Sequence, residues 1–67
     1  MTYNQALNNC KEASKKYPTK LFFVIDEYGD GNNFEYCEDR ELETYFLGLK
    51  EENILCAIIE GEIEEEY

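Results

Sequence analysis

Carboxylates are the most abundant groups in this sequence that could do chemistry. Sixteen of its 67 residues are Asp or Glu, and adjacent pairs such as Asp26 and Glu27 or Glu51 and Glu52 could in principle share general acid and base roles. Such catalysis requires two carboxyls in sharply different environments, because only then do their pKa values separate. In so acidic a chain, neighbouring pairs arise by chance and most are solvated. The sequence therefore predicts no catalytic residue and no enzyme.

Three cysteines, Cys10, Cys37 and Cys56, are the other reactive candidates, and the chain contains no histidine. Without histidine there is no imidazole acid or base and no histidine metal ligand. A cysteine nucleophile would lack its usual base, and no Cys-x-x-Cys pair suggests zinc or redox chemistry. We expect the three thiols to be reduced, buried and apolar in character. The sequence predicts neither a metal site nor a cofactor.

Negative charge is concentrated after the first twenty residues. Residues 1–20 contain four lysines and one glutamate, whereas residues 21–67 contain fifteen acids against Arg40 and Lys50, and the net charge is −10. Solubility alone requires a net charge of only about 2–8 in magnitude. Direct binding of nucleic acid or of an anionic membrane is disfavoured, because it requires Lys and Arg. The charge favours a protein partner with a basic, nucleic-acid-binding groove.

The segment from Thr2 to Pro18 has the pattern of an amphipathic helix. Thr2 and Gln5 have the spacing of a capping box, and Lys15 and Lys16 lie in the expected last turn, where cations complement the helix dipole. The apolar face of this helix consists of Tyr3, Ala6, Leu7, Cys10, Ala13, Ser14 and Tyr17. Pro18 ends the pattern.

Two strands and a second helix are expected next. Residues 20–28 are rich in aromatic and β-branched residues and predict a strand, residues 29–33 form a Gly-, Asp- and Asn-rich turn, and residues 34–37 return as a second strand. A capping acid, Glu38 or Asp39, precedes a helical stripe of Leu42, Tyr45, Phe46 and Leu49. That helix would end near Asn53.

The end of the chain predicts a third strand over residues 54–59. Residues 61–67 either prolong this strand or form an acidic tail that departs from it. The whole sequence thus predicts one α+β domain, residues 1–67, with the order α-β-β-α-β. A helical crossover would give a three-stranded antiparallel or mixed sheet of order 2-1-3, with the third strand antiparallel to the first and both helices on one face.

Apolar residues occupy both faces of the first and third predicted strands. Two helices on one face would leave the other face bare, as an interface with a second copy or with a partner. The alternative is that one helix covers each face. A homodimer is therefore one outcome that the pattern allows.

The expected binding surface consists of outward-facing acids with two apolar anchors, Tyr28 and Leu47. Glu43 and Glu51 lie on the polar side of the second predicted helix, and the alternation of Glu60, Glu62 and Glu64 would place them on one side of an extended chain at about 6.7 Å spacing. The predicted partner-binding residues are Tyr28, Asp30, Glu43, Leu47, Glu51, Glu60, Glu62 and Glu64. Carboxylate rows of this kind would imitate a short stretch of phosphates.

The stretch FEYCEDRELETYFLGLKEE and the end EGEIEEEY, within so small and acidic a chain, carry a family resemblance. The sequence resembles the small phage-encoded inhibitors: anti-CRISPR proteins, antirestriction proteins and other DNA mimics. The resemblance implies a non-enzymatic, stoichiometric block of a host nucleic-acid-binding complex, such as a nuclease or transcription complex, through an acidic face. Two alternatives remain open, a dimeric structural or assembly protein and an antitoxin or immunity protein that binds a basic partner.

Nothing in the sequence predicts export or membrane insertion. The first residues lack the basic and then apolar pattern of a signal peptide. The longest apolar runs, residues 21–25 and 54–59, are far shorter than the roughly 20 residues of a membrane span. We expect a cytoplasmic protein, located in the host cell if it is phage-encoded.

Overall fold

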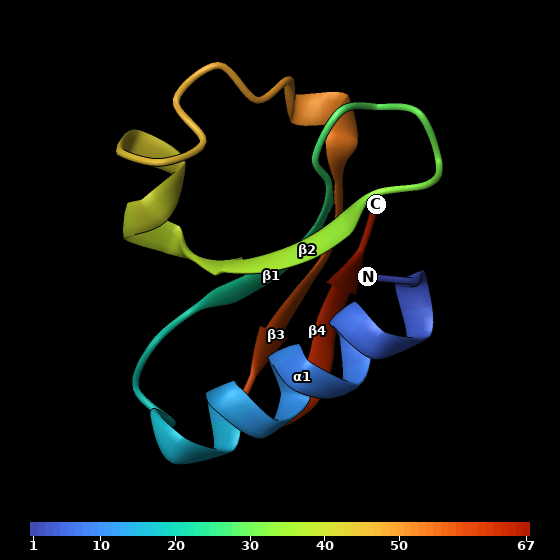
Figure 1. Cartoon of the computed structure of the whole chain (residues 1–67). Coiled ribbons are helices and arrows are strands. Elements are labelled where there is room, and N and C mark those ends of the chain that lie inside the picture. The colour runs from blue at the N-terminus through green and yellow to red at the C-terminus, as the bar shows by residue number, and fades with distance from the viewer.

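The computed structural model describes all 67 residues as an α+β fold with one α-helix, α1 (Tyr3–Lys16), against a four-stranded sheet. The strands are β1 (Phe22–Asp26), β2 (Phe34–Glu38), β3 (Ile54–Ile59) and β4 (Glu62–Glu66). All neighbouring strands are antiparallel, in the order β2-β1-β3-β4 (Figure 1). Two short 3-10 helices, η1 (Asp39–Glu43) and η2 (Glu51–Asn53), lie between β2 and β3.

The first helix begins as its sequence predicts. The Thr2 hydroxyl accepts the Gln5 N–H at 3.2 Å, and the Gln5 side chain accepts the Thr2 N–H at 2.9 Å. This reciprocal pair satisfies two backbone donors that a helix start leaves free. The helix ends at Lys16, two residues before Pro18. Local signals at both ends therefore define α1.

The predicted architecture of two helices on a three-stranded sheet is wrong, and residues 39–53 are one reason. They form η1, a run of turns over residues 44–48, and η2 rather than an α-helix. Thr44 leaves the helical region with φ −123° and ψ −78°. Weak helix formers at residues 44–46, followed by Gly48, lower the helix propensity further. Tyr45, which the helical pattern places in the core, is 82% exposed.

The end of the chain is the second reason, because it turns back and adds β4 to the sheet. Glu60 and Gly61 form the turn with φ values of 53° and 77°, and positive φ at both central residues is typical of a two-residue hairpin. The Gly61 N–H donates a 2.7 Å hydrogen bond to the Ser14 hydroxyl of α1. The positive φ of Gly61 favours glycine at this position, and a Cβ atom there would also displace the Lys15 side chain, whose Cε would lie 2.6 Å away.

Each face of the sheet is covered by a different segment of the chain. On one face α1 packs through Ala6 and Cys10 against a cluster that contains Val24 and Ile58. On the other, residues 39–53 pack against a cluster of Phe23, Ile25, Cys37 and Ala57. The prediction that both helices share one face is therefore wrong. The bare apolar face on which a homodimer could rest is covered by the chain itself.

Candidate protein-interaction surface

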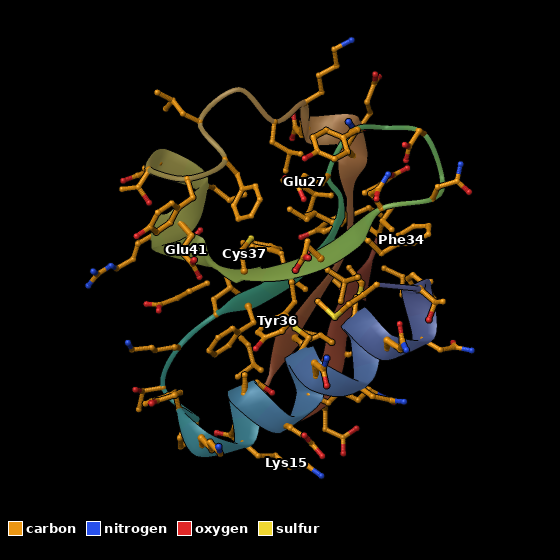
Figure 2. All side chains as sticks on the ribbon, viewed as in Figure 1. Lys15, Glu27, Phe34, Tyr36, Cys37 and Glu41 are labelled. Atoms are coloured by element: carbon orange, nitrogen blue, oxygen red, sulfur yellow. The ribbon has the colours of Figure 1, made fainter.

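Charge on the surface is divided between α1 and the rest of the molecule. Three of the six basic residues lie on α1 and a fourth, Lys20, follows it, whereas fifteen of the sixteen acids lie beyond residue 20. Figure 2 shows Lys15 at the lower end of the molecule, with Glu27 and Glu41 toward the opposite end. The end remote from α1 is therefore predominantly acidic.

Few carboxylates are neutralised within the chain. The one ion pair joins Lys20 Nζ to Glu38 Oε1 at 3.3 Å. Asp30 organises its own turn, since its Oδ1 accepts the N–H groups of Asn32 at 2.9 Å and Asn33 at 3.2 Å. The hydrogen bond from the Asn32 N–H, together with those from Asn33, lowers the pKa of the Asp30 carboxyl. The other acids form no ion pair and can meet a basic partner.

Two glutamates of β4 lie on the sheet face remote from α1. Glu62 is paired with Ile59 and Glu65 with Ala57, and directly opposite residues on neighbouring strands share a face. Ala57 belongs to the cluster beneath residues 39–53, which fixes that face as the one remote from α1. Because β4 pairs only with β3, these carboxylates lie at the rim of the sheet.

Tyr67 connects the glutamates of β4 to η2. Its hydroxyl donates to Glu65 Oε2 at 3.3 Å. Reduced contact with water and the nearby carboxylates of Glu65 and Glu51 raise the pKa of the Tyr67 phenol. Tyr67 also lines an open hollow with Lys50, Glu51 and Glu52. The acids of β4 and η2 therefore belong to one continuous surface.

The same surface continues to the turn between β1 and β2. Glu52 lines a second hollow together with Glu27 and Tyr28, which belong to that turn. We call this row of side chains the acidic band, and its members are Glu62, Glu65, Tyr67, Glu51, Glu52 and Glu27. Lys50 lies within it and forms no ion pair.

The second hollow, which Glu27, Tyr28 and Glu52 line, is a shallow depression beside the acidic band. One wall is formed by residues 27–29 and the other by residues 48–50. A neighbouring hollow shares Glu27, Tyr28, Gly48 and Leu49 and adds the rings of Tyr45 and Phe46. We call the two together the aromatic trough. Tyr28 is 70% exposed and Tyr45 is 82% exposed.

Three of the eight partner-binding residues that the sequence predicts lie in these two features. Tyr28 lines the aromatic trough, and Glu51 and Glu62 belong to the acidic band. Leu47 is 76% exposed and belongs to the loop that forms one wall of the trough, but it does not line the trough. An apolar anchor at Tyr28 therefore has a defined recess beside it.

The other predicted residues are exposed but separate. Asp30 is hydrogen-bonded within its turn, and Glu43 lies at the end of η1. The expected single row of Glu60, Glu62 and Glu64 does not form, because the chain reverses at Glu60 and the pairing of β4 shifts register at Glu64. A turn and a bulge thus replace the straight strand that this spacing assumed.

Sequence reasoning missed the Tyr45 ring of the aromatic trough and four members of the acidic band, which are Glu27, Glu52, Glu65 and Tyr67. The alternation of Glu65 and Tyr67 is a detectable strand pattern. No local pattern places Tyr45 on the surface, since its spacing from Leu42 and Leu49 suggests burial. The meeting of residues 27–29 with residues 48–50 is a tertiary contact and has no signature in either segment.

The cysteines are not positioned for chemistry at neutral pH. Cys10, Cys37 and Cys56 are buried and form no disulfide. Burial raises the pKa of the Cys10 and Cys37 thiols to about 12. Because the thiolate is the nucleophile and the metal ligand, both thiols stay protonated and inert.

No family model, curated protein or solved structure matches this chain. None of its helices combines the length and the apolar character needed to cross a membrane.

Proposed function

We propose that this protein is a non-enzymatic inhibitor that blocks a host nucleic-acid-binding complex by placing its acidic band in the groove for the phosphate backbone. The observation that carries the proposal is the acidic band itself. Its carboxylates run from β4 across η2 to the β1–β2 turn without an internal ion pair. A basic groove supplies the missing countercharges.

The spacing of the band suits the imitation of phosphates. Glu62 and Glu65 of β4 pair with Ile59 and Ala57 of β3. Those two partners are two residues apart, which corresponds to about 6.7 Å along a strand. Along one strand of duplex DNA, charges recur about every 3.4 Å of helix axis. The spacing of these two residues is therefore of the same order as the spacing of charges along a nucleic-acid backbone, and Glu51 and Glu52 extend the charge beyond the end of β4.

Charge and exposed rings have different roles in this proposal. Complementary charges mainly accelerate encounter and fix the orientation of a complex. Exposed aromatic side chains in recesses usually contribute more of the affinity. Tyr28 and Tyr45 provide such rings beside the carboxylates. We therefore expect the band to set the association rate and the tyrosines to set the dissociation rate.

The test is displacement of labelled DNA from a panel of purified complexes: an RNA-guided nuclease, a restriction enzyme and a bacterial RNA polymerase. The band variant carries Glu51→Lys, Glu62→Lys and Glu65→Lys. A matched control carries Glu12→Lys, Glu43→Lys and Glu60→Lys, three exposed positions outside the band. Both variants have the same net charge, so a difference between them reports position and not total charge.

We expect the unaltered protein to displace DNA from at least one complex, with an inhibition constant that weakens as salt rises. The band variant should lose this inhibition and the control should keep most of it. Failure to displace DNA from any member of the panel, or equal loss in both variants, contradicts the proposal. Inhibition of a basic toxin in place of these complexes would favour the antitoxin alternative.

A further inference from the structure

The aromatic trough has an apolar lining and an acidic rim at its aromatic end. Its lining there consists of Glu27, Tyr28, Tyr45, Phe46, Gly48 and Leu49. No basic residue belongs to this set. Lys50 lines only the other end, with Glu52 and Asn53. A cation that enters the aromatic end therefore meets two exposed rings and a carboxylate, and no basic side chain lines that end.

Both walls of the trough make contacts within the chain, the first with the Asn53 side chain and the second through backbone hydrogen bonds. Gly29 has φ +69°, and a Cβ atom there would lie 3.1 Å from Asn53 Nδ2, so the turn is in close contact with η2. On the other side, the Leu49 N–H donates to the Phe46 carbonyl at 2.9 Å, and the Asn53 N–H donates to the Lys50 carbonyl at 2.9 Å. These contacts define the shape of the recess.

Another tyrosine of the chain already binds a cation on its ring face. Lys20 Nζ lies 5.2 Å from the centre of the Tyr17 ring, an internal cation–π contact. Tyr28 and Tyr45 are more exposed than Tyr17 and have no such contact within the chain. Their faces are free for a cation from outside the molecule.

A carboxylate lies in the same hollow as the Tyr28 ring. Glu27 and Tyr28 both line it, and the nearby Glu27 carboxylate raises the pKa of the Tyr28 phenol. An aromatic face beside a carboxylate suits a planar cation that stacks and hydrogen-bonds at once. Arginine meets this requirement better than lysine, because its guanidinium stacks on rings and pairs with a carboxylate through two parallel N–H groups.

We propose that the aromatic trough binds one arginine side chain of the partner protein, with the guanidinium on Tyr28 and Tyr45 and paired with Glu27. The methylene groups of that arginine lie against Leu49. This inference rests on the proposed function and deepens it, because grooves that hold phosphates are rich in arginine. The trough would capture one such arginine while the acidic band occupies the rest of the groove.

The test is a titration of the isotope-labelled full chain with acetyl-arginine amide, followed by NMR, with acetyl-lysine amide as the comparison ligand. We expect shifts concentrated at the backbone amides of Gly29, Gly48 and Leu49, and affinity at least about fivefold higher for arginine. Tyr28→Ala and Tyr45→Ala should each weaken binding by about two- to fivefold, the loss expected when one cation–π contact at an exposed site is removed.

Two controls separate the ring from general charge effects. Tyr28→Phe retains the ring and should bind within about twofold of the unaltered chain. Tyr17→Ala removes an exposed tyrosine outside the trough and should change nothing. Equal affinity for the two amides, or shifts spread over all acidic segments, overturns the inference.

The outcomes also separate this inference from the proposed function. If the arginine amide fails to bind while the band variant still loses inhibition, the trough assignment alone is wrong. If the amide binds selectively at the trough and no nucleic-acid-binding complex is inhibited, the trough assignment stands and the proposed function is wrong.

Discussion

The two segments that cover the sheet differ in how they are held. On one face, α1 is a 14-residue helix with a capping box, and it buries Ala6, Cys10 and Ser14 completely. On the other, η1 and η2 are short, and neither contains a buried residue. Segments with few buried contacts open at low free-energy cost. We therefore expect the α1 side to contribute most of the stability of the fold and the side of residues 39–53 to make the contacts with a ligand.

Exposure of apolar side chains follows the same division. A regular helix turns one stripe inward and leaves polar residues outside. Residues 39–53 instead follow successive turns, so Leu42, Phe46 and Leu49 reach the core while Tyr45 and Leu47 point to water. The irregular segment thereby presents large apolar groups next to carboxylates, which a single amphipathic helix would have buried.

Truncation of the core on each side should separate the two segments most clearly. Ile58→Ala on the α1 side removes a fully buried side chain and should cost about 2–5 kcal/mol of unfolding free energy. Leu42→Ala removes a half-buried one and should cost about 1 kcal/mol. Urea unfolding measures both, with Ile58→Val as a milder replacement if the alanine variant does not fold. Equal losses for Ile58→Ala and Leu42→Ala would contradict the division.

High pH should reveal how well each side excludes water, because Cys10 and Cys37 belong to opposite clusters. Burial raises the pKa of each thiol from 9.0 to about 12. Below pH 9 the thiols are neutral in both states and this stabilisation is fully present. Between pH 9 and 12 unfolded thiols ionise first, so stability falls by about 1 kcal/mol per thiol at pH 10.

Thermal unfolding at pH 7 and pH 10 measures this loss, and the Cys10→Ala and Cys37→Ala variants are the controls. Each variant should remove about half of the stability loss that Cys10 and Cys37 together cause between pH 7 and pH 10. If only Cys10→Ala does so, water reaches Cys37 in the folded state and the cover on that side is incomplete.

Loss of the contact between α1 and the β3–β4 turn should have an intermediate effect. Ser14→Ala leaves the buried Gly61 N–H without its 2.7 Å acceptor and should cost about 1–3 kcal/mol. Thr19→Ala, at an exposed position, is the control. Hydrogen exchange should show faster opening of β4 in the Ser14 variant. A cost similar to that of Thr19→Ala would mean that α1 does not position β4.

Removal of single side-chain acceptors at the helix starts should have the smallest effect. Thr2→Ala removes the acceptor of the Gln5 N–H and should cost about 1 kcal/mol. Glu41→Ala removes the acceptor of the Glu38 N–H at the start of η1 and should cost less, because that short segment can adjust or bind water. Calorimetry resolves the two changes, and a larger loss for Glu41→Ala would reverse the comparison.

Elements with signals at their own ends were predictable from the sequence. The capping box at Thr2 and Gln5 fixed the start of α1, and the Gly- and Asn-rich turn at residues 29–33 fixed the hairpin of β1 and β2. The turns that replace the expected second helix were not predictable, because the spacing of Leu42, Phe46 and Leu49 is compatible with both a helix and a chain of turns.

The candidate site was only partly predictable for a related reason. The sequence identified Tyr28, Glu51 and Glu62, each from its own segment. Their arrangement depends on contacts between segments, such as the approach of Gly29 to Asn53 and the hydrogen bond of Tyr67 to Glu65. Residues far apart in the chain acquire a common surface only when the core brings their elements together.

The sequence by itself determined the excess of acids after residue 20, the absence of histidine, and the limits of α1 and the first hairpin. These properties depend on composition or on residues that are close together in the sequence. Tertiary structure alone decided that β4 returns to the sheet, that residues 39–53 cover its second face, and that the trough opens between two loops. Those outcomes depend on burial between distant segments, whose free energy no local pattern contains.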